Sequence, residues 1–249
     1  EKFLKKVFSN YNISSVVHFA GLKSVKESFE KPSEYFTTNV SGTINIIKAM
    51  EIANVKKIIF SSSATVYNET QTLPWKESGE LDYSGSPYAQ TKIMSEKILE
   101  QAALANAEWS VGILRYFNPI GSDKFGLIGE NIIKESTNLI PSLVNVLLGR
   151  KKHLDVYGAD FKTADGSGIR DYIHIDDLIN GHIKAHSYIN RRSGYNIWNL
   201  GTGKGYSVFE VIKEFETAAN CKIPIKIRKR RKGDLAKFWA DVKKARDEL

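Results

Sequence analysis

Tyr88 and Lys92 have the residue types and the spacing that proton transfer needs. They are four residues apart near the start of a predicted helix, so their side chains share one face of that helix. An ammonium beside a phenol lowers the pKa of the phenol, which makes a tyrosine a usable base near neutral pH. The alternative is a surface pair with a partly packed ring, because composition alone predicts about one such spacing in this chain.

Two other segments place small or polar residues at the end of a predicted strand. The serines Ser61 to Ser63 directly follow a buried apolar run, and so does the loop Phe19–Lys23. Ala20 and Gly21 of that loop would let a ligand approach the backbone closely. Ligands of α/β sheets bind at the carboxyl ends of strands, so we expect both segments to face one crevice. For the serines, a polar loop that caps a helix is the alternative.

Arg170 and Arg231 are candidates for binding phosphate, because a guanidinium presents a fork of N–H donors. Ordinary ion pairs with carboxylates are the alternative for both arginines. His182 and His186 are four residues apart, but no third ligand has a matching spacing, so we expect no metal site.

The elements that must position these groups alternate between strands and helices. Apolar runs predict strands over 16–19, 58–60 and 111–114, each buried on both faces. Apolar residues at helical spacing predict helices between these strands, over 36–50 and 94–105. Strands that alternate with helices in this way predict an α/β fold around a parallel sheet.

The second half has longer loops and predicts a smaller α/β lobe interleaved with the first. Its predicted elements are helices at 140–148 and after 176, and strands at 154–157, 195–200 and 223–227. Ser207 and Glu210 have the spacing of a capping box at the start of a further helix. We therefore expect residues 1–118 to form one domain and 119–249 mainly a second, with 169–200 returning partly to the first sheet.

Composition excludes several classes of protein. With 42% hydrophobic and 26% charged residues over 249 positions, the chain is neither disordered, nor collagen-like, nor a membrane bundle. No signal peptide is visible at its start. The single cysteine, Cys221, has no internal disulfide partner, so we expect a reducing compartment, the cytoplasm.

The formal net charge of +8 comes from one segment. Residues 222–233 carry seven basic side chains and no acid, and the other residues hold 29 basic against 28 acidic side chains. Such a patch suits a phosphate on DNA, on RNA or on a small nucleotide. A solvated, basic strand end is the alternative.

Seven motifs in the order of the chain resemble those of the extended short-chain dehydrogenase/reductase family, and within it the enzymes that epimerise nucleotide sugars at C4. The motifs are HFAGLK (His18–Lys23), SSSATVY (Ser61–Tyr67), SPYAQTK (Ser86–Lys92), LRYFNP (Leu114–Pro119), DGSGIRDYIH (Asp165–His174), NLGTGKG (Asn199–Gly205) and RRKGD (Arg230–Asp234).

The resemblance implies a Rossmann-type doubly wound parallel sheet that binds NAD, with a smaller C-terminal lobe for a UDP-sugar. The family's sheet opens with a βαβ unit whose Gly-rich loop holds the NAD pyrophosphate, and no such loop precedes the first predicted strand. That strand resembles the fourth of the family's sheet. We therefore expect roughly 60 N-terminal residues and a shorter C-terminal piece to be absent. The chain as given is then expected to bind NAD poorly and to be inactive.

The resemblance also implies an activity, the interconversion of UDP-glucose and UDP-galactose by transient oxidation at sugar C4. Tyr88 would take the proton of the C4 hydroxyl, Ser63 would hydrogen-bond the same oxygen, and Lys92 would lower the tyrosine pKa and bind the nicotinamide ribose. The implied cofactor contacts are Phe19, Ala20, Gly21, Leu22, Lys23, Thr38, Ser63, Tyr88, Lys92 and Phe117. The implied substrate contacts are Lys23, Ser63, Tyr88, Asn118, Asn138, Leu139, Asp155, Val156, Tyr157, Arg170, Arg231, Asp234 and Phe238.

Four positions depart from the family's pattern. Thr38 stands where an asparagine near the cofactor is usual, Asn68 replaces a glycine, and 129–138 lacks the usual prolines. Phe238 occupies the position that gates a sugar N-acetyl group, and its bulky ring predicts a preference for UDP-glucose and UDP-galactose over their N-acetyl forms.

Other activities fit the sequence less well. A nucleotide-sugar 4,6-dehydratase needs an acidic pair after the serine run, where this chain has Ala64 and Thr65, and a decarboxylase would need a glutamate in this loop. A catalytically silent NAD-fold binding protein and a nucleic-acid binder stay as alternatives from other classes. As partners we expect a UDP-sugar, no nucleic acid and no membrane. For the full-length protein we expect a homodimer through the helices over 33–51 and 88–105.

Overall fold

The computed structural model describes residues 2–130, 138–231 and 233–249, and the chain forms two compact units. Unit 1 comprises Glu1–Tyr116, Ile179–Leu200 and Asp241–Leu249, and unit 2 comprises Phe117–Leu178 and Gly201–Ala240. The chain therefore passes between the units four times, whereas we had placed one main boundary at residue 118.

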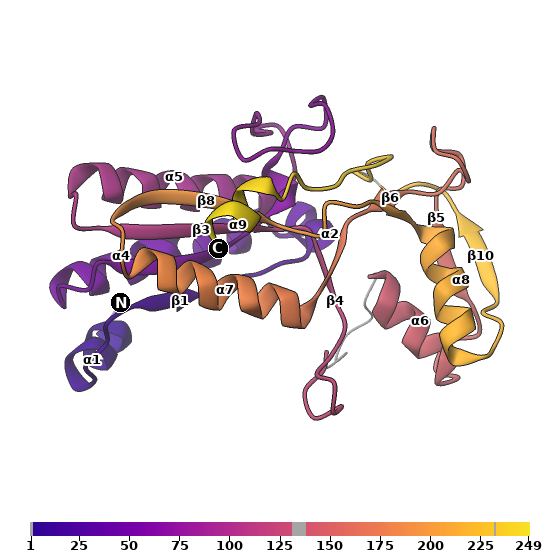
Figure 1. Ribbon diagram of the computed structural model, residues 1–249, viewed down its shortest axis with the longest axis horizontal. Coiled ribbons are helices and arrows are strands. Elements are labelled where there is room, and N and C mark those ends of the chain that lie inside the picture. Colours follow the sequence, from indigo (N-terminus) through magenta and orange to yellow (C-terminus); the bar gives the residue numbers. More distant parts are fainter. Residues whose placement is uncertain (1, 131–137, 232) are drawn as a thin grey trace. The chain divides into compact units, whose positions relative to one another are not determined.

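Unit 1 contains one sheet and the helices on its two faces (Figure 1). Its strands are β1 (Val16–His18), β2 (Lys57–Ser63), β3 (Ser110–Tyr116) and β8 (Gly194–Leu200). Its helical segments are α1 (Lys2–Asn10), α2 (Val25–Glu30), α3 (Pro32–Tyr35), α4 (Gly42–Ile52), α5 (Pro87–Ala105) and α9 (Lys243–Glu248), the π-helix Phe36–Ser41, the 3-10 turn Ala64–Val66, and most of α7 (Ile175–Ile189).

The four strands pair in the order β1-β2-β3-β8, and every pairing is parallel. This confirms the α/β class and the three predicted strands of the first half. A parallel pair needs a crossover connection, and here α5 connects β2 to β3. Because all four strands run the same way, their carboxyl ends lie at one edge of the sheet, where Ser61 to Ser63 end β2.

Alternate residues along the strands separate the two faces of the sheet. Ile58 and Phe60 of β2 pack with α4 and α5 in one apolar cluster that includes Leu99. On the other face, a Cβ on Gly112 would meet Ile59, Trp198 and Ile189 of α7, so only glycine fits there. Helices on both faces explain why these strands are apolar throughout rather than alternating.

The predicted helix over 36–50 is three segments in the structure. Pro32–Tyr35 is α-helical, Phe36–Ser41 is π-helical, and α4 continues from Gly42. A π-turn inserts one extra residue, and such turns frequently occur at functional sites. Apolar spacing could not reveal it, because the apolar face continues through the inserted turn.

Unit 2 has short paired strands and two amphipathic helices. Its elements are β4 (Asn118–Ile120), α6 (Leu139–Leu147), β5 (Leu154–Tyr157), β6 (Ile169–Arg170), β7 (Tyr172–His174), the first residues of α7, β9 (Tyr206–Ser207), α8 (Val208–Ala219) and β10 (Ile225–Arg228). The pairs are β10-β5, β4-β7 and β6-β9, and the predicted strand over 223–227 is β10.

Helices α6 and α8 pack with β5 around a core of Leu143, Leu154, Val156 and Ile212. The predicted capping box is confirmed, because Ser207 accepts from the backbone N–H of Glu210 and the Glu210 side chain accepts from the backbone of Ser207.

Leu99 tests the core of unit 1. Its side chain is fully buried, whereas Leu104 on the same helix is 72% exposed. We expect Leu99→Ala to lower the free energy of unfolding by about 3 kcal/mol, since it leaves a cavity under the sheet, and Leu104→Ala to change it by less than about 0.5 kcal/mol. Urea unfolding of both variants measures this, and equal effects would contradict the assigned core.

Candidate active site

The start of α5 fixes the position of Tyr88. Ser86 caps the helix by accepting from the backbone N–H of Ala89 at 3.2 Å, and Pro87 occupies the first helical position. Tyr88 therefore lies in the first turn and Lys92 one turn later on the same face. Both side chains are buried, with 8% and 6% exposure.

Both residues contact the end of β2. The Ser63 hydroxyl lies near enough to the Tyr88 hydroxyl to lower its pKa, and Lys92 Nζ donates to the carbonyl of Ser61 at 2.7 Å. The Ser63 hydroxyl also accepts from the backbone N–H of Thr65 at 3.2 Å. The structure thus brings Ser63, at the end of β2, together with Tyr88 and Lys92, which the sequence already placed on one face of the same helix.

Burial governs the electrostatics of this group. Desolvation lowers the pKa of Lys92 from 10.5 to about 8, although the carboxylate of Glu96 opposes this. Desolvation also raises the pKa of Tyr88, against the hydrogen bond from Ser63. This differs from our prediction that Lys92 lowers the pKa of Tyr88. The ammonium is 5.8 Å from the centre of the phenol ring and is bonded to the Ser61 carbonyl instead.

The loop Phe19–Lys23 follows β1 in the same unit and is held by Asn39. The Asn39 amide accepts from the backbone N–H of Leu22 at 2.8 Å and donates to the Leu22 carbonyl at 3.0 Å. It also donates to the Thr91 hydroxyl, which donates in turn to the Tyr88 carbonyl. Asn39 therefore connects the loop to the helix of Tyr88.

Sequence reasoning missed Asn39 and named its exposed neighbour Thr38 instead. The sequence held one signal for Asn39: a polar residue lies beside the apolar face of the predicted helix.

Phe19 is 58% exposed and stacks on His182 of α7, with ring centres 4.9 Å apart. His182 also hydrogen-bonds the Tyr116 hydroxyl, and His186 hydrogen-bonds Ser15 at 2.9 Å. The two histidines therefore have side-chain partners. Among the described residues, no cluster of His, Cys, Asp or Glu could hold a metal ion.

Unit 2 contains a cavity of about 450 Å³. Nine predicted substrate contacts are among the residues that line it: Asn118, Asn138, Leu139, Asp155, Val156, Tyr157, Arg170, Arg231 and Asp234. The Oδ1 atom of Asn118 is buried with no hydrogen-bond partner in the described structure. Residues 131–137, which include most of the segment that lacks prolines, lie outside the described residues.

Two arginines share one carboxylate in this cavity. Arg231 binds Asp234 with both Nε, at 2.8 Å, and Nη2, at 3.1 Å, and Arg170 Nη2 lies 3.9 Å from the same carboxylate. Arg231 stacks on Tyr157 and Arg170 on Phe238. Burial lowers the pKa of Arg170 and Asp234 opposes this. The aromatic faces orient both guanidinium groups.

Phe238 and Phe117 are placed differently from the other predicted contacts. Phe238 does not line the cavity. It packs behind Arg170 and against Phe117, with ring centres 6.0 Å apart. Phe117, a predicted cofactor contact, is buried within unit 2 with 5% exposure.

Asp171 is a further residue that the sequence analysis missed. Its fully buried carboxylate accepts from the backbone N–H groups of Thr202 at 2.7 Å, Gly203 at 3.0 Å and Ala240 at 3.1 Å, and from the Thr202 hydroxyl. Asp171 therefore connects the segment 201–203 and Ala240 to the adjacent strand β6, which carries Arg170 and pairs with β9.

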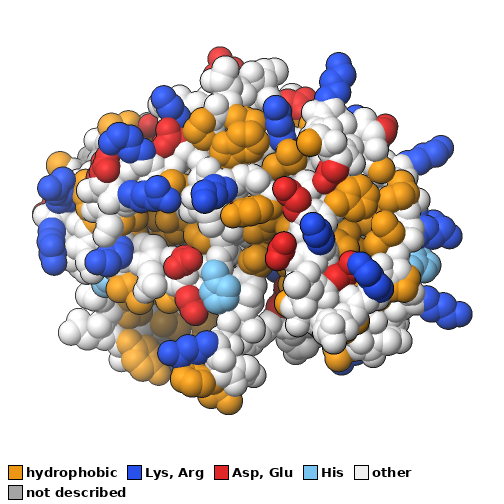
Figure 2. Space-filling model, turned by 45° about the vertical axis from the view of Figure 1, so that its right-hand side comes forward, with side chains coloured by type: hydrophobic (Ala, Val, Ile, Leu, Met, Phe, Trp, Pro, Cys, Tyr) orange, Lys and Arg blue, Asp and Glu red, His pale blue; other side chains and the backbone are white. Residues whose placement is uncertain are grey.

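The basic segment 222–233 is largely neutralised by acids of unit 2. Lys222 pairs with Glu216, Arg228 with Asp155, Arg230 with Asp160, and Arg231 with Asp234. Figure 2 shows Lys and Arg side chains with Asp and Glu among them. These pairs involve four of the seven basic side chains of the segment and count against a surface for nucleic acid.

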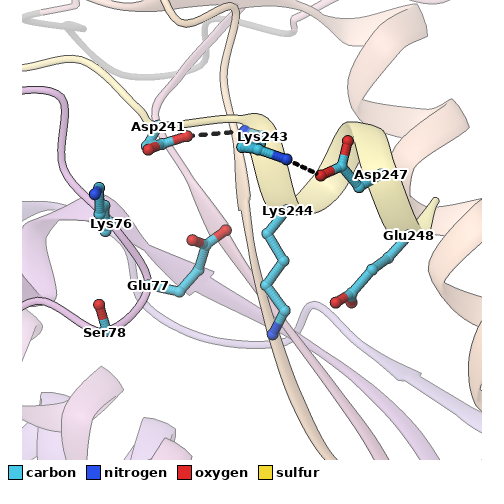
Figure 3. Close-up of a pocket in the computed structure, with 8 residues that line it drawn as sticks. All are labelled: Lys76, Glu77, Ser78, Asp241, Lys243, Lys244, Asp247 and Glu248. Atoms are coloured by element: carbon cyan, nitrogen blue, oxygen red, sulfur yellow. Dashed lines mark hydrogen bonds and ion pairs between the residues drawn. The ribbon is translucent and has the colours of Figure 1, made fainter.

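A second hollow, of about 460 Å³, lies in unit 1 between Lys76–Ser78 and the C-terminal segment (Figure 3). Lys243 pairs there with Asp247, and the backbone N–H of Lys243 donates to Asp241 at 2.9 Å. It contains no residue of the predicted site.

Lys92 should reduce the stability of the fold that holds it. Its pKa is lower in the folded chain than in the unfolded chain, so the penalty for charging it is full below pH 8 and disappears as the pH rises to 10.5. We expect Lys92→Met to raise the free energy of unfolding by roughly 1–2 kcal/mol at pH 7, allowing for the lost hydrogen bond. The gain should shrink above pH 8.

Urea unfolding between pH 7 and pH 10 measures this effect. Lys97→Met on the exposed side of α5 is the control, because Lys97 is 65% exposed and its removal should change stability little. A loss of stability in Lys92→Met at pH 7 would show that the ammonium stabilises the fold.

Comparison with known proteins places this chain among nucleotide-sugar enzymes. It is 50% identical over 246 residues to UDP-glucose 4-epimerase of Yersinia enterocolitica, covering 99% of this chain and 73% of the relative. It is 46% identical over 243 residues to UDP-glucose 4-epimerase of Bacillus subtilis, covering 98% of this chain and 71% of the relative.

Solved structures agree with this similarity. UDP-glucose 4-epimerase from Bifidobacterium longum, in complex with NAD+ and UDP, matches with a TM-score of 0.95 at 46% identity, over 100% of this chain and 74% of that one. Residues 1–201 match the profile of the NAD dependent epimerase/dehydratase family. The chain belongs to the NAD-dependent epimerase/dehydratase family.

Proposed function

We propose that the full-length protein catalyses the NAD-dependent interconversion of UDP-glucose and UDP-galactose through transient oxidation at sugar C4, and that this chain supplies its catalytic group and its UDP-sugar cavity. The observation that supports this most is the contact of Tyr88 with Ser63 beside Lys92, in a chain that is 43–50% identical to several curated UDP-glucose 4-epimerases. Unit 1 supplies these three residues, and unit 2 supplies the cavity with two arginines.

The residues of unit 1 fit NAD. Asn39 binds both backbone hydrogen-bonding groups of Leu22 and so holds the loop in place. A Cβ on Gly21 would lie 3.0 Å from the Asn39 amide oxygen, so a glycine suits this position, and Phe19 in the same loop is exposed. We infer that Phe19–Lys23, Ser63, Tyr88 and Lys92 hold the nicotinamide end of the cofactor, with Thr38 as a further contact. When bound, NAD would supply the acceptor for the hydride of sugar C4 and the donor for its return to the other face of the ring.

The chain's own residues then move the proton. Tyr88 takes the proton of the C4 hydroxyl as a general base and gives it back when the sugar is reduced. Ser63, which lies beside Tyr88, binds the same sugar oxygen. The proton therefore has only a short distance to move between the sugar and Tyr88. Lys92 binds the ribose of the cofactor and supplies positive charge near the phenol. The buried position of Tyr88 excludes water from this proton transfer.

Unit 2 would bind the UDP part of the substrate. Arg170 and Arg231 present two guanidinium groups with one carboxylate between them, which leaves net positive charge for a diphosphate. Asn118, with its orphaned buried oxygen, and Asn138 offer polar groups, and Leu139 and Tyr157 offer apolar and aromatic surface. Asp155 would act mainly through Arg228, to which it is bound at 2.6 Å.

A dehydratase is the second candidate and is less well supported. Dehydration needs an acid and a base next to the serine of the strand end. Here these two positions hold Ala64, which is buried, and Thr65, which donates its hydroxyl to Ser63 at 3.0 Å. Neither residue can serve as the acid or the base of a dehydration.

We also propose a homodimer and a cytoplasmic location. Apolar side chains of α4 and α5 are exposed, among them Ile52, Met94 and Leu104, which suits an interface between two copies. In the described residues no helix has the length and apolar character needed to cross a membrane. The lone Cys221 suits a reducing compartment.

Tyr88→Phe tests the proposed base. In the full-length gene product, removal of the hydroxyl should lower kcat with UDP-galactose by roughly 10²–10⁴-fold, while the ring stays packed and the fold stays intact. A coupled assay that detects UDP-glucose measures this, with Tyr83→Phe as the control because Tyr83 is 71% exposed. Unchanged turnover would remove Tyr88 from the mechanism.

Phe238 tests substrate preference. We expect the full-length enzyme to turn over UDP-N-acetylglucosamine at least tenfold less efficiently than UDP-glucose, because the resemblance gives Phe238 the position that gates an added N-acetyl group, although its ring packs behind Arg170 and does not line the cavity. Steady-state kinetics with both substrates measure the ratio of kcat/KM. Comparable values would show that Phe238 does not select the sugar.

A further inference from the structure

Three successive turns of α5 contact three successive residues of β2. Tyr88 lies beside the Ser63 side chain, Lys92 bonds the Ser61 carbonyl, and Glu96 accepts a hydrogen bond from the Ser62 hydroxyl at 2.5 Å. The first two contacts belong to the catalytic group described above. The third has no part in it, yet Glu96 is 2% exposed, and an ionised carboxylate is buried only where it is paired.

The partner of Glu96 comes from the neighbouring strand. Arg115 of β3 lies directly opposite Ser62 in the register of the sheet, and its Nε and Nη2 bind the two Glu96 oxygens at 3.0 and 2.7 Å. The carboxylate therefore holds two adjacent strands and one helix together at the level of the catalytic serines. Both charged side chains are almost fully buried, so the pair is not screened by water.

Arg115 also reaches the segment after β2. Its Nη1 donates to the Glu77 carbonyl at 3.1 Å, and its guanidinium lies 4.8 Å from the centre of the Tyr67 ring. Tyr67 in turn donates to Asn199 of β8 at 2.6 Å. The pair is thus the centre of a buried polar network that spans three strands.

We propose that Glu96 is a positioning residue for the Ser63–Tyr88–Lys92 group, bracing α5 against the end of β2 so that Lys92 and Tyr88 reach their partners. Glu96 is one helical turn beyond Lys92, so a shift of α5 that loosens its contact with Ser62 moves the Lys92 ammonium away from the Ser61 carbonyl. This inference rests on the proposed function for its kinetic test only.

The pH dependence of activity gives a readout that a role of Glu96 in folding alone would not change. The titratable and charged groups that face Lys92 are Tyr88 and Glu96 of α5 and His18 of β1, with Arg115 of β3 behind Glu96. Glu96 raises the pKa of Lys92, so its removal lowers that pKa further below 8. An enzyme that needs the Lys92 ammonium would then lose activity at a lower pH.

Glu96→Gln in the full-length enzyme tests the proposal, with Glu100→Gln as a matched control on the exposed, Lys97-paired side of the same helix. We expect Glu96→Gln to lower kcat with UDP-galactose by roughly 10–100-fold with KM nearly unchanged, and to move the alkaline limb of the kcat profile to lower pH. The control should match the parent enzyme. Parental kcat and an unmoved alkaline limb in Glu96→Gln would overturn the proposal.

Ser62→Ala keeps the proposal testable if Glu96→Gln does not fold. It removes one donor and leaves the ion pair, so we expect a lowered kcat with a nearly unchanged melting temperature. Unchanged kcat in this folded variant would overturn the proposal.

A structure of whichever variant folds, made in the present 249-residue chain, separates this inference from the proposed function. Loss of the contact between Lys92 Nζ and the Ser61 carbonyl supports the brace, and its retention counts against it. A parent enzyme without UDP-galactose turnover would instead count against the proposed function alone.

Discussion

The layer between α5 and the sheet of unit 1 combines apolar packing with buried polar groups, and the need to satisfy those groups determines most of the site's geometry. Lys92, Glu96 and Arg115 are each at most 6% exposed. A buried charge without a partner is far more costly than a lost contact at the surface, so each must be bonded. Lys92 is bonded to the Ser61 carbonyl, and Glu96 is bonded to Ser62 and Arg115. These bonds also fix the end of β2 under Tyr88.

Unit 2 obeys the same constraint with a different set of groups. The buried Asp171 is satisfied mainly by backbone N–H donors, so it organises segments of chain. Asp234 is satisfied by arginine side chains, so it organises the cavity. Backbone donors make a rigid support, and arginine donors leave cationic groups near the space where an anion would bind. The fully buried Asp171 thus organises the backbone, whereas Asp234, whose side chain is 16% exposed, lies between the two arginines of the proposed anion site.

The sequence was sufficient for most of the longer elements and for the motifs, and insufficient for the short strands of unit 2, the π-helix Phe36–Ser41 and the partners of buried groups. Strands such as Leu154–Tyr157 follow from local apolar patterns, and so does the capping box at Ser207. The partners of Asp171 lie 31, 32 and 69 residues away in the chain, and Glu96 lies 34 residues from Ser62 and 19 from Arg115. No local pattern reports such pairings. Asn39 was missed for the same reason, since its importance comes from Leu22 and Thr91 and not from its own helix.

The charge of the chain shows why composition alone misleads about partners. The +8 comes mainly from residues 222–233 and suggested an anionic partner for that patch, but four of its basic side chains bind carboxylates of unit 2. Among them only Arg231 lines the cavity, where it and Arg170 are covered on one face by aromatic rings. A guanidinium stacked in this way directs its N–H groups within its own plane, which suits a ligand with several oxygens in fixed positions. The proposed recognition of an anion in unit 2 therefore rests on how two arginines are oriented rather than on how many basic residues the segment contains.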